Sequence, residues 1–302
     1  MTDRQPDLNI VIVTYNSEDV IGDLLDSLPA ALGGLDADVI VVDNDSTDGT
    51  ADFAMAHGGC RVIRSANVGY GGGINRGVHA AVRAEAILVL NADVRLHEGS
   101  IPLLMKALQE PYVGIVAPQV RSPRGELQLS LRRAPSLPRA LGLSRTRLAI
   151  FSEYITKPSH YTSSRFVDWA LGAILLISRQ CYDALGGWDE SYFLYSEEVD
   201  FSLRARDIGL LTRYEPEAVA VHIGGHSGRN HKTHSILIVN RVRFYRRRHG
   251  TASSWCYYAV TLAHEISGII RGHRIARAST TALLLPSRRP PELGTTKQLM
   301  PR

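Results

Sequence analysis

Three apolar runs in the first third of the chain each end in a cluster of polar residues. Such clusters supply the directional donors and acceptors that a nucleotide base needs, and a carboxylate can accept a hydrogen bond from a pyrimidine N3–H. A carboxylate also suits Mg²⁺ or Mn²⁺ beside a diphosphate, because these cations prefer oxygen ligands. The alternative is a polar turn before the next helix. The clusters are Thr14-Tyr15-Asn16, Asp43 to Thr50 (DNDSTDGT) and Asn91-Ala92-Asp93, with Asp93 as the candidate metal ligand.

A glycine-rich segment, Asn67 to Gly77 (NVGYGGGINRG), follows the third apolar run. Backbone N–H groups at a helix start suit a diphosphate, because glycines allow close approach and the helix dipole favours an anion. The alternatives are a flexible turn and a dinucleotide-binding loop, but the latter is expected after the first strand. We therefore interpret the segment as a phosphate-binding loop that opens a helix at Ile74.

Two glutamates and one histidine in the second half are candidates for proton transfer and metal binding. Ser196 is the expected N-cap of a helix, which places Glu197 and Glu198 in its first turn. Capping is the alternative role, but the preceding aromatic run and the nearby Asp200 favour catalysis. A carboxylate that takes a proton from a hydroxyl must be ionised, and a helix N-terminus favours that state. His222, in HIGGHS, is the candidate nitrogen ligand to the same cation.

These residues need a scaffold that gathers strand ends at one place. Alternating strands and helices predict an α/β fold with a Rossmann-like, mostly parallel sheet flanked by helices. Ligands of such sheets bind beyond the carboxyl ends of the strands. Residues 118–165 predict a loop or partly ordered lid. We expect strands at Leu8–Val13, Asp38–Val42, Arg61–Arg64 and Ala86–Leu90, and helices at Val20–Leu28, Ile74–Ala84 and Ser196–Ile208.

The composition is that of a globular protein, with 44% apolar and 21% charged residues. The start, MTDRQPDLN, lacks the basic and apolar stretches of a signal peptide, so we expect a cytoplasmic protein. Three cysteines without a CxxC pair predict neither a disulfide framework nor a zinc knuckle.

The chain is strongly basic from His234 on, with 12 Arg and Lys against 2 Glu. We expect one domain at 1–233 and a basic helical C-terminal extension at 234–302 that ends in a disordered tail. The run Arg241 to Arg248 (RVRFYRRR) indicates an anionic partner. Nucleic acid is disfavoured because the sequence has no recognition module such as an RNP motif.

A helix is expected to follow the arginine run. The helix carries an apolar stripe but has too few consecutive apolar residues to span a bilayer. One interpretation is an interfacial helix on the anionic inner leaflet of the plasma membrane. The other is a helix that packs on protein or forms a homodimer. The stripe consists of Trp255, Ala259, Leu262, Ile266 and Ile269.

Taken together, these segments resemble family 2 glycosyltransferases of the GT-A fold, particularly bacterial rhamnosyltransferase-like members. The resemblance covers about Leu8 to Ser227. It rests on six motifs that occur in order: VTYN, VDNDSTDGT, NVGYGGGINRG, NAD, GGWDESYFLYSEEVDFSLRARDIG and HIGGHS.

The resemblance implies an inverting transfer of a sugar from a nucleotide diphosphate, dTDP-rhamnose or a UDP-sugar, to a hydroxyl of a glycan or polyprenyl-linked acceptor. It assigns metal binding to Asp93 and His222, and the base to Glu198, with Glu197 as the alternative. The competing hypotheses are a sugar-phosphate nucleotidyltransferase and a non-catalytic nucleotide-sugar-binding module. The residues implied to bind the nucleotide sugar are Thr14, Tyr15, Asn16, Asp43, Asn67, Gly69, Asn75, Asn91 and Asp93.

Overall fold

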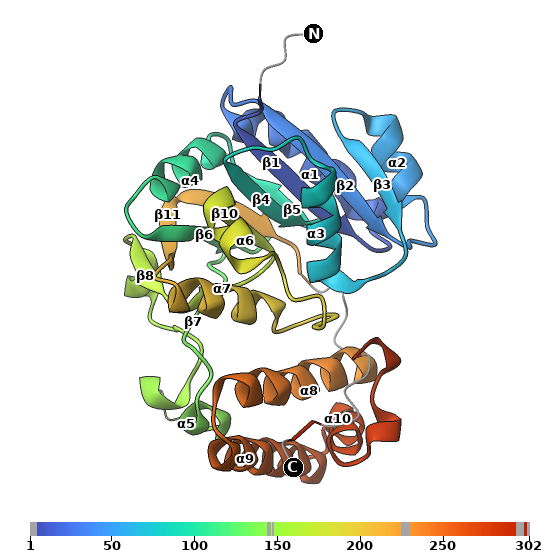
Figure 1. Ribbon diagram of the computed structural model, residues 1–302, viewed down its shortest axis with the longest axis vertical. Coiled ribbons are helices and arrows are strands. Elements are labelled where there is room, and N and C mark those ends of the chain that lie inside the picture. The colour runs from blue at the N-terminus through green and yellow to red at the C-terminus, as the bar shows by residue number, and fades with distance from the viewer. Residues whose placement is uncertain (1–4, 144–145, 147, 225–229, 294–298, 301–302) are drawn as a thin grey trace.

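The computed structural model describes residues 5–143, 146, 148–224, 230–293 and 299–300. A large sheet occupies one part of the molecule, and a helical unit lies below it in Figure 1. The strands of the sheet follow the order β3-β2-β1-β4-β10-β6-β11-β5, with β8 paired to β11. The predicted α/β class, with a mostly parallel sheet and C-terminal helices, is confirmed.

The four strands predicted from the apolar runs form the parallel half of the sheet. β1 lies between β2 and β4, with Thr14 opposite Asp43 and Val13 opposite Asn91. The polar strand ends therefore share one edge of the sheet, as parallel topology requires. The strands are β1 (Leu8–Thr14), β2 (Ala37–Asn44), β3 (Arg61–Ser65) and β4 (Ala86–Asn91).

Side chains of β1 alternate between two cores, one on each face of the sheet. Ile10 and Ile12 pack in the core that contains α1 and α4, whereas Val11 and Val13 pack in the core that contains α3, α6 and α7. Burial on both faces explains why the strand is an unbroken apolar run. The helices are α1 (Glu18–Leu32), α3 (Gly69–Ala80), α4 (Ser100–Leu108), α6 (Arg179–Leu185) and α7 (Glu197–Asp207); α2 (Thr50–His57) packs beside α1 and β3.

The other half of the sheet mixes strand directions. β10 runs antiparallel to β4 and β6, and β11 runs parallel to β6. The antiparallel β5–β11 pair sets Val94 opposite His222, which brings Asp93 beside the end of β11. These strands are β5 (Val94–Leu96), β6 (Val113–Arg121), β8 (Arg165–Val167), β10 (Ile174–Ser178) and β11 (Leu211–His222).

The predicted boundaries of two helices are wrong. α1 does not stop at Pro29 but runs to Leu32 and ends at Gly33, which takes a left-handed φ of 56°. A proline this near the helix end removes only one hydrogen bond, so the last turn tolerates it. The glycine-rich segment is itself helical, since α3 begins at Gly69 rather than Ile74.

The glycines of α3 allow this helix to lie directly on the sheet. A Cβ at Gly73 would lie 2.8 Å from Val13, and one at Gly77 would lie 2.4 Å from Val11. Both distances are shorter than side chains tolerate, so the glycine run serves close helix–strand packing.

The segment predicted as a loop or lid contains only short elements after β6. They are β7 (Leu131–Arg132), which pairs with β9 (Trp169–Ala170), α5 (Leu137–Ala140), and the 3₁₀ helices η2 (Ala149–Phe151) and η3 (Pro158–Tyr161). α5 and η2 lie against the helical unit.

The basic extension forms three helices with a core of their own. Val239 and Tyr257 are among its fully buried side chains, and Leu299 and Met300 also pack there. Residues 294–298 and 301–302 of the predicted tail lie outside the described residues. Across the described ranges, no helix combines the length and apolarity needed to cross a bilayer. The helices are α8 (His231–Arg248), α9 (Thr251–Ile270) and α10 (Ile275–Leu284), followed by η4 (Pro286–Arg288) and η5 (Pro291–Leu293).

Three arginines of the run pair with acids elsewhere in the protein, and an external anionic partner stays a prediction. Arg247 pairs with Asp189 and Arg248 with Asp207, both at 2.5 Å. Arg241 pairs with Glu153. The opposite net charges of the two parts of the chain therefore attract each other.

Candidate active site

The ends of β1 and β2 form a compact polar corner. The Thr14 hydroxyl donates to Oδ1 of Asp43 at 3.1 Å, and the Ser46 hydroxyl donates to the same oxygen. Oδ2 of Asp43 receives only a long bond, 3.4 Å, from the Ser46 N–H. Asp43 thus keeps acceptor capacity on the oxygen that faces away from Thr14.

Two neighbours of this corner differ in how they are held. Asn16 has a left-handed φ of 50°, and its side-chain oxygen accepts from the Thr47 N–H at 2.8 Å. That bond ties Asn16 to the turn after β2, so its role here is to hold the loop. Tyr15 is 55% exposed and presents an aromatic ring beside the corner.

Asp93 and His222 face each other across the start of β5 and the end of β11. Oδ1 of Asp93 lies 3.4 Å from Nε2 of His222, and Oδ2 accepts the Gly224 N–H at 3.0 Å. Burial on its own raises the pKa of Asp93, but these hydrogen bonds outweigh it and hold the pKa below its usual value. Gly225 to Ser227 of the predicted HIGGHS motif lie outside the described residues.

Gln128 fixes the histidine. Its amide donates to the His222 carbonyl at 2.7 Å, and its oxygen lies 3.4 Å from Nδ1 of the ring. A partner on Nδ1 leaves Nε2 directed at Asp93. No sequence signal pointed to Gln128, because it lies in the irregular segment after β6.

Glu197 and Glu198 begin α7 as predicted, but Ser196 does not cap the helix with its side chain. Ser196 takes a left-handed φ of 76° and makes no side-chain cap bond. The third acid, Asp200, pairs with Arg204 at 2.6 Å. Asp200 is therefore engaged within α7, whereas backbone N–H groups at the helix start are the partners of Glu197 and Glu198.

The helix start does not lower the pKa values of these glutamates, contrary to the stabilising effect expected of the helix dipole. Burial, and then the charge of Glu198, raises the pKa of Glu197 well above its usual value. Burial also raises the pKa of Glu198, with Arg132 opposing it in part. One carboxylate oxygen of each glutamate is buried without a hydrogen-bond partner. Desolvation thus exceeds the stabilisation by the helix dipole.

Tyr70 is a half-buried residue on which the charges of Asp93, Glu197 and Glu198 all act. Burial, followed by the negative charges of Glu197, Glu198 and Asp93, raises the pKa of the Tyr70 hydroxyl. That hydroxyl donates to the Gly172 carbonyl at 2.9 Å. The charge of Asp93 and the charges of the adjacent pair Glu197 and Glu198, more than a hundred residues later, therefore act on one tyrosine.

The backbone near Gly172 shows how close the elements come. The Asn91 N–H donates to the carbonyl of Ala173 at 2.9 Å, so the end of β4 is bonded to the residue after Gly172. A Cβ on Gly172 would lie 3.0 Å from the Cβ of Glu198. The start of α7 thus packs directly on the chain beside Asn91. Tyr70 is the aromatic residue within the glycine-rich segment. Its position there is the sequence feature that could have indicated its place in the site.

Comparison with known proteins identifies the family. Residues 9–166 match the model of glycosyl transferase family 2. The chain is 32% identical over 298 residues to the N-acetylglucosaminyl-diphospho-decaprenol L-rhamnosyltransferase of Mycobacterium tuberculosis, covering 92% of this chain and 95% of that protein. This chain belongs to glycosyl transferase family 2. It is a glycosyltransferase, which decides against the nucleotidyltransferase and the non-catalytic module.

Other relatives agree with this assignment. Rhamnosyltransferase WbbL of Escherichia coli K12 is 26% identical, covering 73% of this chain and 85% of that protein. The fold matches a mannosyltransferase of Pyrobaculum calidifontis solved with GDP-Man and Mn²⁺ (TM-score 0.55, 16% identity, 98% and 85% coverage). It also matches S. aureus TarS in complex with UDP-GlcNAc (TM-score 0.56, 15% identity, 95% and 82% coverage). The predicted GT-A fold is confirmed.

In this family 2 glycosyltransferase, the side chain of Asn75, predicted in the nucleotide site, is bonded within the protein. Its amide donates to the Trp188 carbonyl and to Glu190, each at 2.9 Å. Its oxygen accepts from the Tyr182 hydroxyl and the Trp188 N–H, also at 2.9 Å. All four hydrogen-bonding positions of the amide are used, so none remains for a ligand.

Gly69 and Asn67 also hold the fold together. Gly69 has a φ of 81°, and a Cβ there would lie 2.0 Å from the Phe193 carbonyl oxygen. The Tyr70 N–H donates to that carbonyl, and Asn67 accepts from the Gly69 N–H at 3.1 Å. The start of α3 is thus covered by the loop before α7, and the predicted open phosphate loop is not formed there.

Helix α8 of the extension holds the loop that carries the glutamates. Asn240 is fully buried and donates to the carbonyls of Leu194 and Tyr195 at 3.0 and 3.1 Å. Arg243 donates to the Ser191 carbonyl. The extension is therefore part of the scaffold of the active site.

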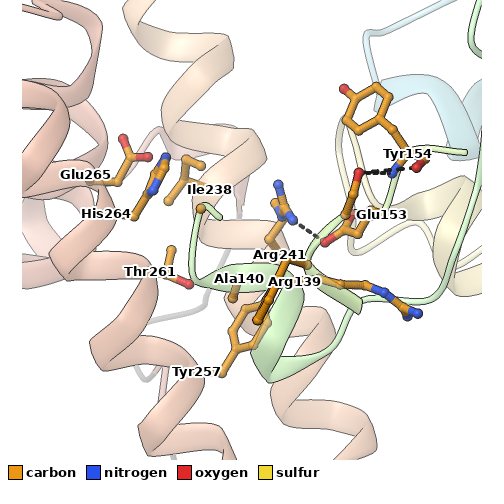
Figure 2. A pocket seen from close by; sticks show the side chains of 13 residues that line it. Arg139, Ala140, Glu153, Tyr154, Ile238, Arg241, Tyr257, Thr261, His264 and Glu265 are labelled. Carbon is orange, nitrogen blue, oxygen red and sulfur yellow. Dashed lines mark hydrogen bonds and ion pairs between the residues drawn. The ribbon is translucent and has the colours of Figure 1, made fainter. Parts of the chain in front are cut away.

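A separate cavity of about 190 Å³ lies between residues 139–142 and 151–154 on one side and helices α8 and α9 on the other. Figure 2 shows Arg241 of α8 reaching Glu153 on one side, with His264 and Glu265 of α9 on the other. None of the predicted nucleotide, metal or base residues lines it. This cavity is thus distinct from the site at the sheet edge.

Proposed function

We propose that this enzyme moves L-rhamnose from dTDP-rhamnose, with inversion, to a hydroxyl of a polyprenyl-linked sugar in cell-envelope polysaccharide synthesis. The M. tuberculosis and E. coli relatives are rhamnosyltransferases, and the name of the first includes a decaprenol-linked sugar. The observation that carries the catalytic part is that the start of α7, with Glu198, packs on Gly172, whose neighbour Ala173 is bonded to Asn91, two residues before Asp93. Such an acceptor would place the enzyme at the inner face of the plasma membrane.

The polar corner is suited to a pyrimidine nucleotide. Asp43 has free acceptor capacity on Oδ2, which can receive a pyrimidine N3–H, while Thr14 fixes the orientation of its carboxylate. Tyr15 presents an exposed ring on which a base can stack. Asn91, at the same sheet edge, is within the region where the ribose would lie.

Asp93 and His222 fit a divalent cation by their chemistry. They offer one carboxylate oxygen and one imidazole nitrogen 3.4 Å apart, each oriented by an outer partner. Among the described residues, no group of three His, Cys, Asp or Glu could hold a metal alone, so the diphosphate and water would complete the coordination. Mg²⁺ or Mn²⁺ bound there would offset the charge that develops on the leaving diphosphate.

Glu198 is the better candidate for the base. Glu197 is deeper in the protein, and its pKa is raised further, so it holds a proton more tightly. Glu198 is half-buried, and the positive charge of Arg132 favours its ionised form. An ionised Glu198 would accept the proton of the acceptor hydroxyl as the oxygen attacks the anomeric carbon from the side opposite the diphosphate.

Isothermal titration with dTDP, UDP and GDP in the presence of Mn²⁺ tests the donor. We expect dTDP to bind at least tenfold more tightly than the other two, and EDTA to weaken its binding. The affinity of Asp93→Asn for dTDP should be the same with and without Mn²⁺. It should equal the affinity of the wild type in EDTA. Asp183→Asn, which alters a surface carboxylate paired with Arg83, is the control and should behave as wild type. Preferential binding of UDP would overturn the proposed donor.

A further inference from the structure

Helix α9 is oriented with its polar side chains inward. Its buried residues are small or polar, whereas a surface helix ordinarily buries its apolar stripe. Glu265 is buried and bonds to His234 at 3.0 Å, and Ser254 donates to the Gly250 carbonyl at 3.0 Å. The full set of buried residues is Ser254, Tyr257, Thr261, Glu265 and Gly268.

The opposite face of α9 is exposed and apolar. Trp255 is 47% exposed and Ile270 81%. The stripe expected from the sequence is only partly correct, because Leu262 and Ile269 are half-buried. The exposed face carries no charged Asp, Glu, Lys or Arg, and its apolar members are Ala252, Trp255, Cys256, Ala259, Ala263, Ile266 and Ile270.

A second apolar group continues this face. Gly142 lies directly against His264 of α9, which brings the exposed Leu141 and Leu143 beside the helix. Figure 1 shows α9 at the edge of the molecule farthest from the sheet, with α5 at one end of it and α8 between it and the sheet. An exposed apolar area of this kind marks an interaction surface. We call α9 with Leu141 and Leu143 the α9 face.

Uncompensated positive charge borders the α9 face at the C-terminal end of the helix. Arg271, Arg274 and Arg277 are exposed, and no acid among the described residues pairs with them. From Thr251 to Leu293 the only acids are Glu265 and Glu292, and they pair with His234 and Lys232.

We infer that the α9 face docks on an anionic lipid membrane. A tryptophan among aliphatic side chains suits the interfacial region of a bilayer, and nearby arginines are attracted to anionic headgroups. A second copy of this chain is a less suitable partner for the α9 face than an anionic membrane. In a symmetric pair each α9 face would bring its arginines to a like surface that has no free carboxylate.

Sedimentation of the full chain with vesicles tests the inference without any sugar donor, so its outcome is independent of the proposed transfer reaction. We expect binding to vesicles of equal parts phosphatidylglycerol and phosphatidylcholine, and much weaker binding to phosphatidylcholine alone. Ile266→Glu combined with Ile270→Glu should lower binding at least tenfold. Val82→Glu, at an exposed apolar residue of the sheet unit, is the control and should bind as wild type.

A second variant separates charge from apolar contact. Arg274→Gln combined with Arg277→Gln should remove most of the preference for anionic vesicles. An unchanged melting temperature shows that each variant is folded. The inference is overturned if the wild type binds neither vesicle, or if the glutamate pair binds as well as wild type. It is also overturned if light scattering without lipid shows a wild-type dimer that the glutamate pair dissociates.

Discussion

Glu197 and Glu198 are adjacent in sequence but differ in their surroundings. The sequence placed both at a helix N-terminus, where the dipole favours ionised acids. In the folded protein burial has the larger effect, and the pKa of each rises. The deeper Glu197 is raised more, whereas Arg132 moderates the shift of Glu198. Two similar carboxylates therefore acquire different tendencies to hold a proton, which is a common basis for dividing roles.

The raised pKa of Glu197 predicts how stability depends on pH. Because the folded-state pKa exceeds the unfolded value of about 4.5, the extra stability is present below that value and is lost as pH rises. The loss can reach about 1.4 kcal/mol per pH unit. Glu197→Gln cannot ionise there. Its melting temperature should therefore rise relative to that of the wild type as the pH increases from 5 to 8. A difference that stays constant over this range would contradict the shift.

At the scale of elements, α8 supports the loop that precedes α7. Asn240 holds two of its carbonyls, and Arg247 pairs with Asp189 within it. From the sequence, α8 is expected in a separate extension that faces an anionic partner. Its bonds instead show that the extension contributes to the position of the glutamates.

Asn240→Ala tests this role of α8. The change leaves two buried carbonyls unpaired and should cost about 2 kcal/mol of unfolding free energy, measured by urea denaturation. It should also lower kcat severalfold, because the glutamates lose their support. Asn230→Ala removes the N-cap of α8 and should cost about 1 kcal/mol with kcat unchanged. Equal effects of both changes on kcat would show that α8 acts through stability alone.

The sequence predicted the elements whose pattern is local. Burial on both faces makes Leu8–Val13 a strand in any context, and parallel pairing then brings Thr14, Asp43 and Asn91 to one edge. Features that depend on distant partners were not predictable. The four bonds of Asn75 come from Tyr182, Trp188 and Glu190, more than a hundred residues away.

The orientation of α9 shows the same limit. Periodicity located an apolar stripe that is partly correct, but it could not say which side of the helix is buried. That choice depends on His234 and Ser279, which satisfy Glu265 from other helices. A buried acid with partners can reverse the usual orientation of an amphipathic helix.

At the scale of the whole molecule, the fold joins an acidic sheet unit and a basic helical unit through ion pairs such as Arg241–Glu153 and Arg248–Asp207. The predicted division at residue 233 stays a prediction, since α8 packs on the loop that leads into α7. The charges of Asp93, just before β5, and of Glu198, at the start of α7, both act on Tyr70. We propose that Asp93 and Glu198 serve one reaction at this place.

Turnover of Glu198→Gln tests that claim most directly. With dTDP-rhamnose, a polyprenyl-linked acceptor and Mn²⁺, we predict that kcat falls by roughly 10²-fold or more, while the Kd for dTDP in Mn²⁺ equals that of the wild type. Glu197→Gln, measured in parallel, should keep most of the turnover. Full turnover in Glu198→Gln, or loss confined to Glu197→Gln, would contradict the account.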